Sequence, residues 1–377
     1  MGITRLAEIT TKGRDAGRFD VASIVSSNLI VTPAVTASGM LKLITWKLDN
    51  SGTLTRLGDS GDLGAGAQIT GVATPSVTAP ANVCTVFRRA SGDLGLIVWK
   101  LNVAKGTFTI EGSGVSEGPG SCLDAQSSAQ ALVSVWRDGS GDLRLKSRSI
   151  ETLGVLGNAK AGTVSAVAHP ILADVFVTPV IVDCVDIMKL IVWRLDQDGS
   201  LVRIGDSGNA GGKASRVAAA QIGGKWATAA RAGDDWAMTS GSLAGLGNGM
   251  LRISFWERAN GSLHRAVDKL TAIPIIDVDA RGLDYSESGL GGVKEHYRIV
   301  TAVRAANGKL RLMVWNWLPQ EAKINLDADS GEQPEPISYL RLHSLGNDLY
   351  MTMVRDDTPD NKGKPLHRLK LITWRIQ

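Results

Sequence analysis

The sequence predicts an all-β chain built from a repeated four-stranded unit, and three observations support this. A Leu-x-Leu-x-x-Trp core recurs at intervals of 45 to 63 residues. Each core lies in a short apolar and β-branched run bounded by Gly, Asn or Asp, which indicates a buried strand and not a helix. The last core stops near the end of the chain, while the first residues resemble the strand that should follow it. Because periods of about 50 residues are typical of propeller blades, we predict a seven-bladed β-propeller of four-stranded antiparallel blades.

Six cores keep the tryptophan, and one core is degenerate. The first and last cores share the letters LKLITW, whereas the third, LRLKSR, has Arg148 where the tryptophan should stand. The cores lie at 41–46, 94–99, 143–148, 188–193, 251–256, 310–315 and 369–374.

Each core is predicted to be the third of four strands, counted from the centre of the fold. A β-rich run such as 29–35 precedes it across a short turn containing Gly39 or its equivalent, which is a hairpin signal. Another turn then leads to an outer strand such as 52–58. A loop follows, and after it a run of small residues such as 67–72 or 275–278. Small residues suit the innermost strand, where strands crowd around a central channel.

The N-terminal residues should complete the last blade. Gly2 to Leu6 match the pattern of Gly52 to Leu57 and precede the expected first inner strand near 19–24. Pairing of the two chain ends would remove the exposed edge that an open array presents. We therefore predict a single domain, residues 1–377, in which residues 2–6 form the outer strand of the last blade.

The repeats are uneven at three hairpins. The segments 233–249 and 356–367 both lengthen the turn before a core, so both should rise on one face of the propeller, whereas 281–296 should open on the opposite face. Long loops on a rigid scaffold often carry function, and tolerated drift explains such insertions equally well.

Composition excludes several classes of protein. The net charge of +4 arises from 41 basic and 37 acidic residues with no basic tract, so we expect no nucleic-acid partner. No run of 18 apolar residues suggests a membrane span. We expect a monomer. The location is cytoplasmic by default, or secreted if a signal has been removed. The cysteines are too few and too far apart for a disulfide framework or a metal site, and buried thiols are expected at Cys84, Cys122 and Cys184.

The recurrent tryptophans have two interpretations. They would form a ring of sugar-stacking platforms if they faced solvent. The favoured interpretation is that each fills the space between two blades, because a tryptophan within a Leu/Ile/Val strand suits a buried position.

A second repeated feature combines Arg and Asp. An Arg follows three residues after Thr or Ser in five of the second strands, and Asp-Ser-Gly follows the outer strand at Asp59, Asp206 and Asp329. The favoured interpretation is that Arg and Asp pair and lock neighbouring blades. The alternative is a basic rim that binds a carboxylate, sulfate or phosphate. The Thr/Arg pairs are Thr85/Arg88, Ser134/Arg137, Thr228/Arg231, Thr301/Arg304 and Thr352/Arg355.

The sequence contains no recognisable catalytic motif. Its five histidines have no metal-ligand spacing, and no nucleophile elbow, P-loop or dinucleotide fingerprint occurs. We assign no catalytic residue, no metal ligand and no cofactor. The exception considered is Ca²⁺ at the Gly-rich loops 58–66 and 205–212, whose oxygens do not follow the EF-hand order.

Polar residues that do not repeat are the better candidates for one asymmetric site. Carboxylates near a Trp and a His suit a cation, a sugar or general acid–base chemistry, although solvated loop tips would look the same. On the insertion-bearing face these candidates are Asp234, Asp235, Trp236, Asp356, Asp357, Asp360 and His367, with Asp183 and Asp186 in the turn of the fourth repeat.

The unit LIxWxL…GxLxRxGDSG resembles the repeats of bacterial seven-bladed β-propeller proteins. More loosely, it resembles the propeller part of the cyanobacterial alkylating enzymes that form cylindrocyclophanes. The resemblance rests on blade-packing residues, so it implies the fold and carries over no catalytic residue. The additional calcium-binding domain of those enzymes has no counterpart in this sequence.

We therefore predict a non-enzymatic propeller that binds a carbohydrate or protein partner on the face carrying 233–249 and 356–367. The alternative is an enzyme of specialised metabolism with its active site at the mouth of the central channel.

Overall fold

The structure is a computed structural model of the 377-residue chain. It describes the residues in the ranges 1–11, 23–26, 28–36, 38–61, 66–73, 82–89, 91–114, 119–127, 132–148, 153–156, 167–168, 175–182, 186–197, 200–222, 225–232, 249–259, 262–289, 292–346, 348–359 and 361–377.

The described chain is almost entirely β-structure, as predicted. The strands are β1 (Ile3–Thr10), β2 (Ser23–Ser26), β3 (Leu29–Val35), β4 (Leu41–Leu48), β5 (Leu54–Asp59), β6 (Ala67–Ala73), β7 (Asn82–Arg89), β8 (Leu94–Asn102), β9 (Thr107–Gly114), β10 (Gly120–Ser127), β11 (Leu132–Asp138), β12 (Leu143–Arg148), β13 (Leu153–Leu156), β14 (Val167–Ala168), β15 (Val175–Val182), β16 (Ile187–Leu195), β17 (Leu201–Asp206), β18 (Ala214–Ile222), β19 (Lys225–Ala232), β20 (Met250–Ala259), β21 (Ser262–Gly289), β22 (Gly292–Ala305), β23 (Lys309–Leu318), β24 (Lys323–Gly346), β25 (Leu349–Asp356) and β26 (Arg368–Ile376). A single 3₁₀ turn, η2 (Pro319–Glu321), precedes β24.

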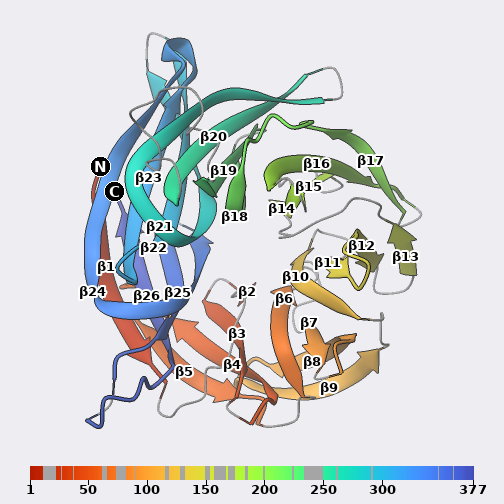
Figure 1. The fold of residues 1–377 in the computed structure, drawn as a ribbon. Helices are drawn as coiled ribbons and strands as arrows, with labels where there is room; N and C mark the ends of the chain where they lie inside the picture. The colour runs from red at the N-terminus through yellow and green to blue at the C-terminus, as the bar shows by residue number, and fades with distance from the viewer. Residues whose placement is uncertain are drawn as a thin grey trace.

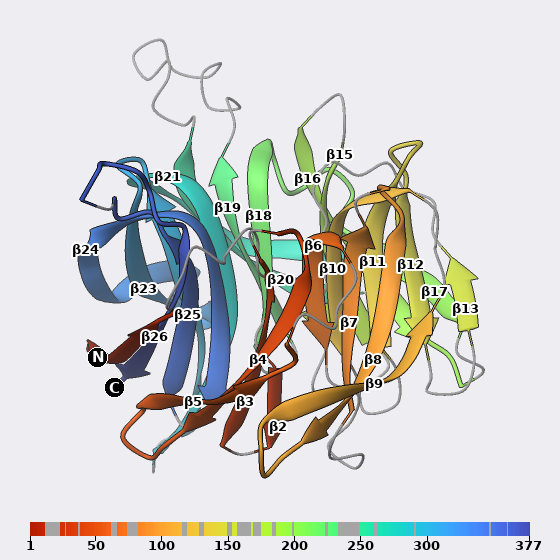
Figure 2. The same ribbon diagram turned by 90° about the horizontal axis from the view of Figure 1, so that it is seen from below.

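The strands form antiparallel sheets arranged around a common centre (Figure 1; Figure 2 gives the view from below). Four sheets have four strands each, β2–β5, β6–β9, β10–β13 and β14–β17, and we call these the first to fourth sets. The remaining sheet has ten strands in the order β1-β26-β25-β24-β23-β22-β21-β20-β19-β18.

Two long strands explain why the last sheet has ten strands. Residues 262–274 of β21 pair with β20, and residues 275–289 pair with β22. In the same way, residues 323–336 of β24 pair with β23, and residues 337–346 pair with β25. Each long strand is therefore the outer strand of one four-stranded set and the inner strand of the next. We call these the fifth set (β18 to the first part of β21), the sixth set (β21 to the first part of β24) and the seventh set (the second part of β24, β25, β26 and β1).

The predicted pairing of the chain ends is confirmed. β1 is antiparallel to β26, and Arg5 lies opposite Trp374. The register slips at Leu6, between Arg5 and Ala7, as it slips between Arg56 and Gly58 opposite Trp46 in the first set. Such a slip is a β-bulge, which bends the strand locally. The N-terminal strand therefore reproduces the bulged outer strand of the repeat.

The core lies between consecutive sets. Trp99 of the second set packs in a cluster with Leu41 and Leu43 of the first. Trp46 of the first set packs with Met351 and Leu371 of the seventh. Trp46, Trp99, Trp193, Trp256, Trp315 and Trp374 are all 0–3% exposed. This confirms that the repeated tryptophans are buried wedges and not sugar platforms.

Two expectations about individual strands need correction. The segment 281–296 does lengthen its hairpin, but as strands and not as a loop, because β21 and β22 continue as paired strands to Gly289 and Gly292. The inner strands are not uniformly small: β18 is Ala-rich, but Asp279, Arg281 and Arg341 lie on β21 and β24. Among the described residues, no helix is long and apolar enough to span a bilayer.

Candidate functional site

The threonine on the strand before each repeated tryptophan accepts a hydrogen bond from the indole N–H. Trp46 Nε1 donates to Thr32 Oγ1 at 2.8 Å, and Trp374 Nε1 donates to Thr352 Oγ1 at 2.9 Å. A buried indole N–H needs such an acceptor. The sequence offers a signal for this pairing, since each of these Trp residues has a Thr on the strand before it. The equivalent donors and acceptors are Trp99/Thr85, Trp193/Thr178, Trp256/Thr228 and Trp315/Thr301.

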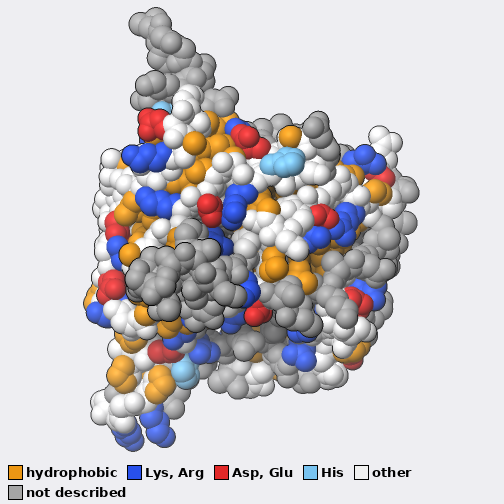
Figure 3. All heavy atoms as spheres, turned by 45° about the horizontal axis from the view of Figure 1, so that its top comes forward, with side chains coloured by type: hydrophobic (Ala, Val, Ile, Leu, Met, Phe, Trp, Pro, Cys, Tyr) orange, Lys and Arg blue, Asp and Glu red, His pale blue; other side chains and the backbone are white. Residues whose placement is uncertain are grey.

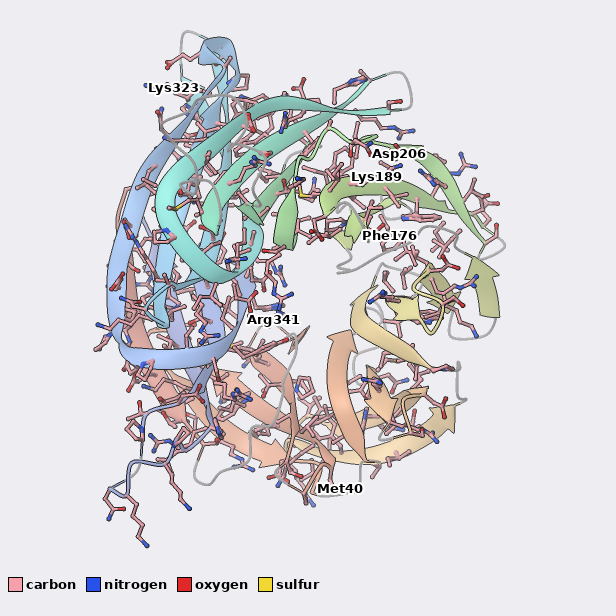
Figure 4. The ribbon with its side chains drawn as sticks, viewed as in Figure 1. Met40, Phe176, Lys189, Asp206, Lys323 and Arg341 are labelled. Carbon is pink, nitrogen blue, oxygen red and sulfur yellow. The ribbon has the colours of Figure 1, made fainter. Side chains whose placement is uncertain are left out.

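The Asp-Ser-Gly motif fixes the turn after three of the outer strands, at Asp59, Asp206 and Asp329. Asp206 Oδ1 accepts the Gly208 N–H at 2.6 Å, and Ser207 Oγ accepts the Leu190 N–H at 3.0 Å. Asp206 also pairs with Arg203 and with Lys189, the latter at 3.4 Å (Figure 4). Burial opposes ionisation, yet the Gly208 N–H and the Arg203 and Lys189 cations lower the pKa of Asp206. Asp59 has equivalent partners in Gly61, Arg56 and Lys42, whereas Asp329 accepts the Gly331 N–H and pairs with Arg311 of β23.

The expected pairing of these aspartates with the second-strand arginines was wrong. Asp59 pairs with Arg56 three residues earlier on its own outer strand. The second-strand arginines lie elsewhere: Arg231 Nε donates to the Ile275 carbonyl at 2.9 Å and Arg304 Nη1 to the Ser338 carbonyl at 3.4 Å. Both carbonyls belong to the inner strand of the next set, so these arginines do tie neighbouring sets together, through backbone and not through Asp.

These contacts bear on the predicted calcium loops. Both carboxylate oxygens of Asp59 are engaged, Oδ1 by the Gly61 N–H and Oδ2 by Arg56 and Lys42. A calcium ion bound there would have to displace those cations. Calcium binding at these loops stays a prediction.

An open pocket of about 560 Å³ beside the Asp206 turn is lined by Asp206, Ser207, Gly208, Ala210, Ser262, Leu263, His264 and Arg265. Among the residues that the structure describes, no group of three or more His, Cys, Asp or Glu side chains is placed to hold a metal.

Two predicted site residues share a distinctive backbone position. The residue two places before the first Leu of each core has a positive φ, and it is glycine in most sets, as at Gly39 (φ 78°) and Gly92 (φ 95°). His367 (φ 50°) and Asp186 (φ 54°) occupy the same position in the seventh and fourth sets. Asp and His are among the side chains that tolerate this left-handed region at some cost. The fourth and seventh sets therefore lack glycine at the position where the positive φ favours it.

We call residues 356–367 the arm, and its base is held by polar contacts. Asp356 is 1% exposed, and its Oδ1 accepts the Thr358 N–H at 2.9 Å while Oδ2 pairs with Arg368 at 3.3 Å. Burial opposes its ionisation, but hydrogen bonds from Thr358 and the Lys370 and Arg368 charges lower the pKa of Asp356. This carboxylate therefore anchors the arm and is not exposed to a ligand.

Beside this anchor lies a more exposed pair. His367 Nδ1 is 2.6 Å from Asp357 Oδ1, and Arg355 Nε is 3.6 Å from the same oxygen. The side chains of His367 and Asp357 are 46% and 22% exposed. Both residues reach the surface of the arm, as do the exposed residues 361–365. Figure 3 shows basic and acidic side chains mixed over the visible face, with no patch of a single sign.

The structure brings together only part of the predicted site. Asp356, Asp357 and His367 lie together at the base of the arm, whereas Asp186 lies in the β15–β16 turn, on another side of the common centre (Figures 1 and 2). Asp183, Asp234, Asp235, Trp236 and Asp360 lie outside the described residues.

A charged cluster on the inner strands was missed by the sequence analysis. Burial raises the pKa of Asp277, against the charges of Arg341 and Arg216. Burial and the nearby Arg281 charge lower the pKa of His343 to about 3. The signal was available, since charged residues interrupt strands that are otherwise small or apolar. Asp277 lies within 275–278, a segment whose other residues fit the small or apolar inner strand that the repeat predicts.

Solved structures share this fold at low identity. The structure of U3-55K has 12% identity and a TM-score of 0.56, and the match covers 98% of each chain. A chain of the mitotic checkpoint complex has 12% identity and a TM-score of 0.55, and the match covers 99% of this chain and 92% of that chain. Both are β-propeller-like folds, so this chain has an all-β, propeller-like fold. No protein-family model matches the chain, and no curated protein matches its sequence.

Proposed function

We propose that this chain is one closed, seven-bladed propeller domain that serves as a non-enzymatic binding platform. The partner is a protein or a carbohydrate, and it is engaged through the face expected to carry the segments 233–249 and 356–367. Each four-stranded set is one blade in this proposal, and β1 is the outer strand of the last.

Ring closure is supported by contacts that repeat across the chain ends. Thr45 Oγ1 donates to the Gly106 carbonyl of the second set at 3.0 Å. Its counterpart in the other LKLITW segment, Thr373, donates to the Gly52 carbonyl of the first set at 2.6 Å. The seventh set therefore contacts the first as the first contacts the second, and Trp46 fills the interface between the first and the seventh.

The observation that carries the binding proposal is the arm. The repeated Trp, Thr, Asp and Ser side chains are used by the fold, whereas the arm breaks the repeat and presents His367 and Asp357 on a base fixed by buried Asp356. A pre-ordered loop loses less conformational entropy on binding than a flexible one. The arm is therefore an asymmetric feature with a hydrogen-bonded base on a scaffold that is otherwise repetitive.

A protein partner is favoured over a carbohydrate. The six repeated indoles are buried, so they offer no ring faces for a sugar. One solved chain with this fold comes from the mitotic checkpoint complex, which is an example of the fold within an assembly.

The test replaces residues 357–368 with the four residues at 90–93, which make the corresponding turn in the second set. The matched control shortens the hairpin 284–295, which belongs to the opposite face. A glycan array and crosslinking of cell extract should yield a ligand or partner for the wild type, and its affinity should then be measured for both variants. The proposal requires loss of affinity in the arm variant and retention in the control. Retention in the arm variant would contradict it.

A second candidate, an enzyme with its site at the mouth of the central channel, is favoured by the perturbed pKa values of Asp277 and His343. Turnover of a small metabolite that persists in the arm variant but is lost in His343→Ala would support the enzyme and contradict the simple binding platform.

A further inference from the structure

Two aromatic rings of the sixth set hold the ammonium group of a lysine from the fifth set. Tyr297 of β22 lies opposite Trp317 of β23, and the centroids of their rings are 5.2 Å apart. The Nζ atom of Lys225, the first residue of β19, lies 4.5 Å from the centroid of each ring. A cation within about 6 Å of an aromatic face is attracted by the ring quadrupole. The two rings therefore make a cation site, and Lys225 occupies it.

A carboxylate completes this cation site. Glu257 on the neighbouring strand β20 pairs with the Lys225 ammonium. The side chain of Lys225 is 22% exposed, whereas Tyr297 and Trp317 are 7% and 3% exposed, so the occupant borders solvent and the rings lie behind it. Aromatic faces recognise methylated ammonium ligands, and a nearby carboxylate adds a Coulombic attraction. We call Glu257, Tyr297 and Trp317 the ammonium site.

The ammonium site is not part of the repeated unit. Other sets have leucine two residues after the repeated Trp, where the sixth set has Trp317. They have leucine or valine at the position of Lys225, and Lys or Arg at the position of Glu257. The residues at these three positions are Leu48, Leu101 and Leu195, then Leu29 and Val175, then Lys47, Lys100, Arg194 and Arg375. Packing between neighbouring sets therefore does not require an aromatic cation site.

The indole N–H of Trp317 is a second, independent sign of a ligand. Trp317 Nε1 is buried and has no hydrogen-bond partner among the residues that the structure describes. The six repeated tryptophans differ, because each donates to a threonine. A buried donor without an acceptor is costly. This N–H is on the edge of the ring whose face contacts Lys225, so an oxygen a few bonds from a bound ammonium can accept from it.

The ammonium site lies on the face opposite to the arm. Lys225 begins β19, the second strand of the fifth set, whereas the arm follows the end of β25, the second strand of the seventh set. The fifth and sixth sets, which supply the site, adjoin in the ten-stranded sheet (Figure 1). A ligand at this site therefore leaves the arm accessible.

We propose that the ammonium site binds a small methylated ammonium that carries a hydroxyl group, and that Lys225 is a built-in occupant which this ligand displaces. The methyl groups add dispersion contacts with the two rings that a primary ammonium lacks. The hydroxyl supplies an acceptor for Trp317 Nε1, whereas a carboxylate or phosphate in its place would be repelled by Glu257. The flexible four-carbon stem of Lys225 allows its ammonium to move into water. This goes beyond the proposed function, since neither the arm nor its partner takes part.

The experiment is isothermal titration calorimetry of the full chain with choline, tetramethylammonium, phosphocholine and the uncharged isostere of choline in which carbon replaces nitrogen. Choline should bind the wild type weakly, because the site is open only when Lys225 has moved away. Lys225→Ala should tighten choline binding about tenfold or more, since the competing ammonium is gone. Choline should bind more tightly than the other three probes. A gain in affinity cannot result from damage to the fold.

The matched control is Lys269→Ala. Lys269 Nζ lies 5.9 Å from the ring centroid of Trp315, at the interface between the same two sets. This variant removes the same charge and should leave the affinity for choline within about twofold of the wild type. A second variant adds Trp317→Leu to Lys225→Ala, restores the residue of the repeat, and should lose the gain in affinity. Thermal unfolding of each variant checks that it is folded.

Five results would each overturn the ammonium site. They are no measurable heat when choline is added to the wild type, no gain in affinity in Lys225→Ala, an equal gain in Lys269→Ala, retention of the gain after Trp317→Leu, and tighter binding of phosphocholine or of the uncharged isostere than of choline.

Discussion

The two LKLITW segments, 41–46 and 369–374, have identical residues in different surroundings. In both, the Trp donates to a Thr on the preceding strand, and the Thr before the Trp donates to a glycine carbonyl of the adjacent set. The first segment receives its outer strand from the residues that follow it, whereas the second receives β1 from the other end of the chain. The same six residues thus make the same core contacts whatever the chain connectivity.

The turns before these segments differ more. The first is a short turn in which Thr36 Oγ1 accepts the Met40 N–H at 3.1 Å. The second is the arm, whose base is held by Asp356 at the position equivalent to Thr36. The core contacts are therefore conserved between the two copies, while the turn is free to change.

Removal of residues 1–10 should have the largest effect on the stability of the fold. It strips β26 of its antiparallel partner and exposes Trp374, whose ring is covered by Arg5 at 6.0 Å. We expect a loss of more than about 5 kcal/mol of unfolding free energy, measured by urea denaturation. Addition of a peptide with the sequence of residues 1–11 should restore stability in a concentration-dependent manner. Unchanged stability after the deletion would show that β1 does not close the fold.

The next largest losses of stability are expected for Trp46→Ala and Trp374→Ala. Each removes a buried indole and leaves a cavity between two sets, so each should cost about 3–5 kcal/mol. If the chain ends form an interface like the others, the two losses should agree within about 1 kcal/mol. A much smaller cost at Trp374, measured in the same urea titrations, would indicate that the seventh set is less tightly packed.

The stability cost of Asp356→Asn should depend on pH, whereas that of the equivalent change in the first turn should not. The folded pKa of Asp356 is below its unfolded value of about 4, so its contribution is present above pH 4 and is lost as the pH falls through the folded pKa. We expect a cost of about 1–3 kcal/mol at pH 7, from the lost hydrogen bonds to a charged group, and a smaller cost at pH 3. The control, Thr36→Val, removes a group that does not titrate and should have the same cost at both pH values.

His367→Gly should have the smallest effect on the free energy of unfolding. Glycine relieves the left-handed backbone at a gain of about 1 kcal/mol, while loss of the exposed pair with Asp357 costs up to about 1 kcal/mol. The net change should therefore be below about 1 kcal/mol. The reciprocal variant, Gly39→Ala, meets no neighbouring atom within 4 Å, so it should be destabilised by backbone strain alone, by about 1 kcal/mol. A large loss of stability in His367→Gly would show that the ion pair, and not the backbone, holds the arm.

The repeated part of the molecule was largely predictable. Leu41, Trp46 and their equivalents are buried because apolar side chains at a fixed spacing leave few alternatives to a covered strand. The pairing of β1 with β26 followed from matching Leu6 to Leu57, and the contact of Leu6 with Gly52 repeats that of Leu57 with Gly106.

The candidate site was predictable only in part. The grouping of Asp356, Asp357 and His367 followed from their shared hairpin, since residues in one hairpin stay close in space. Their separate roles did not, because burial of Asp356 beside Arg368 and exposure of His367 depend on how the arm meets the sheet.

The sequence by itself determined the all-β class, the repeated unit, the buried tryptophans and the pairing of the chain ends, because periodic apolar residues specify burial locally. Only the tertiary structure decided which polar groups meet across sets. Asp279 reaches the Leu342 N–H 63 residues away, and Trp46 meets Met351 from the far end of the chain. Hydrogen bonds and charges act over a few ångströms in space, and the sequence does not give those distances until the strands have been placed around the centre.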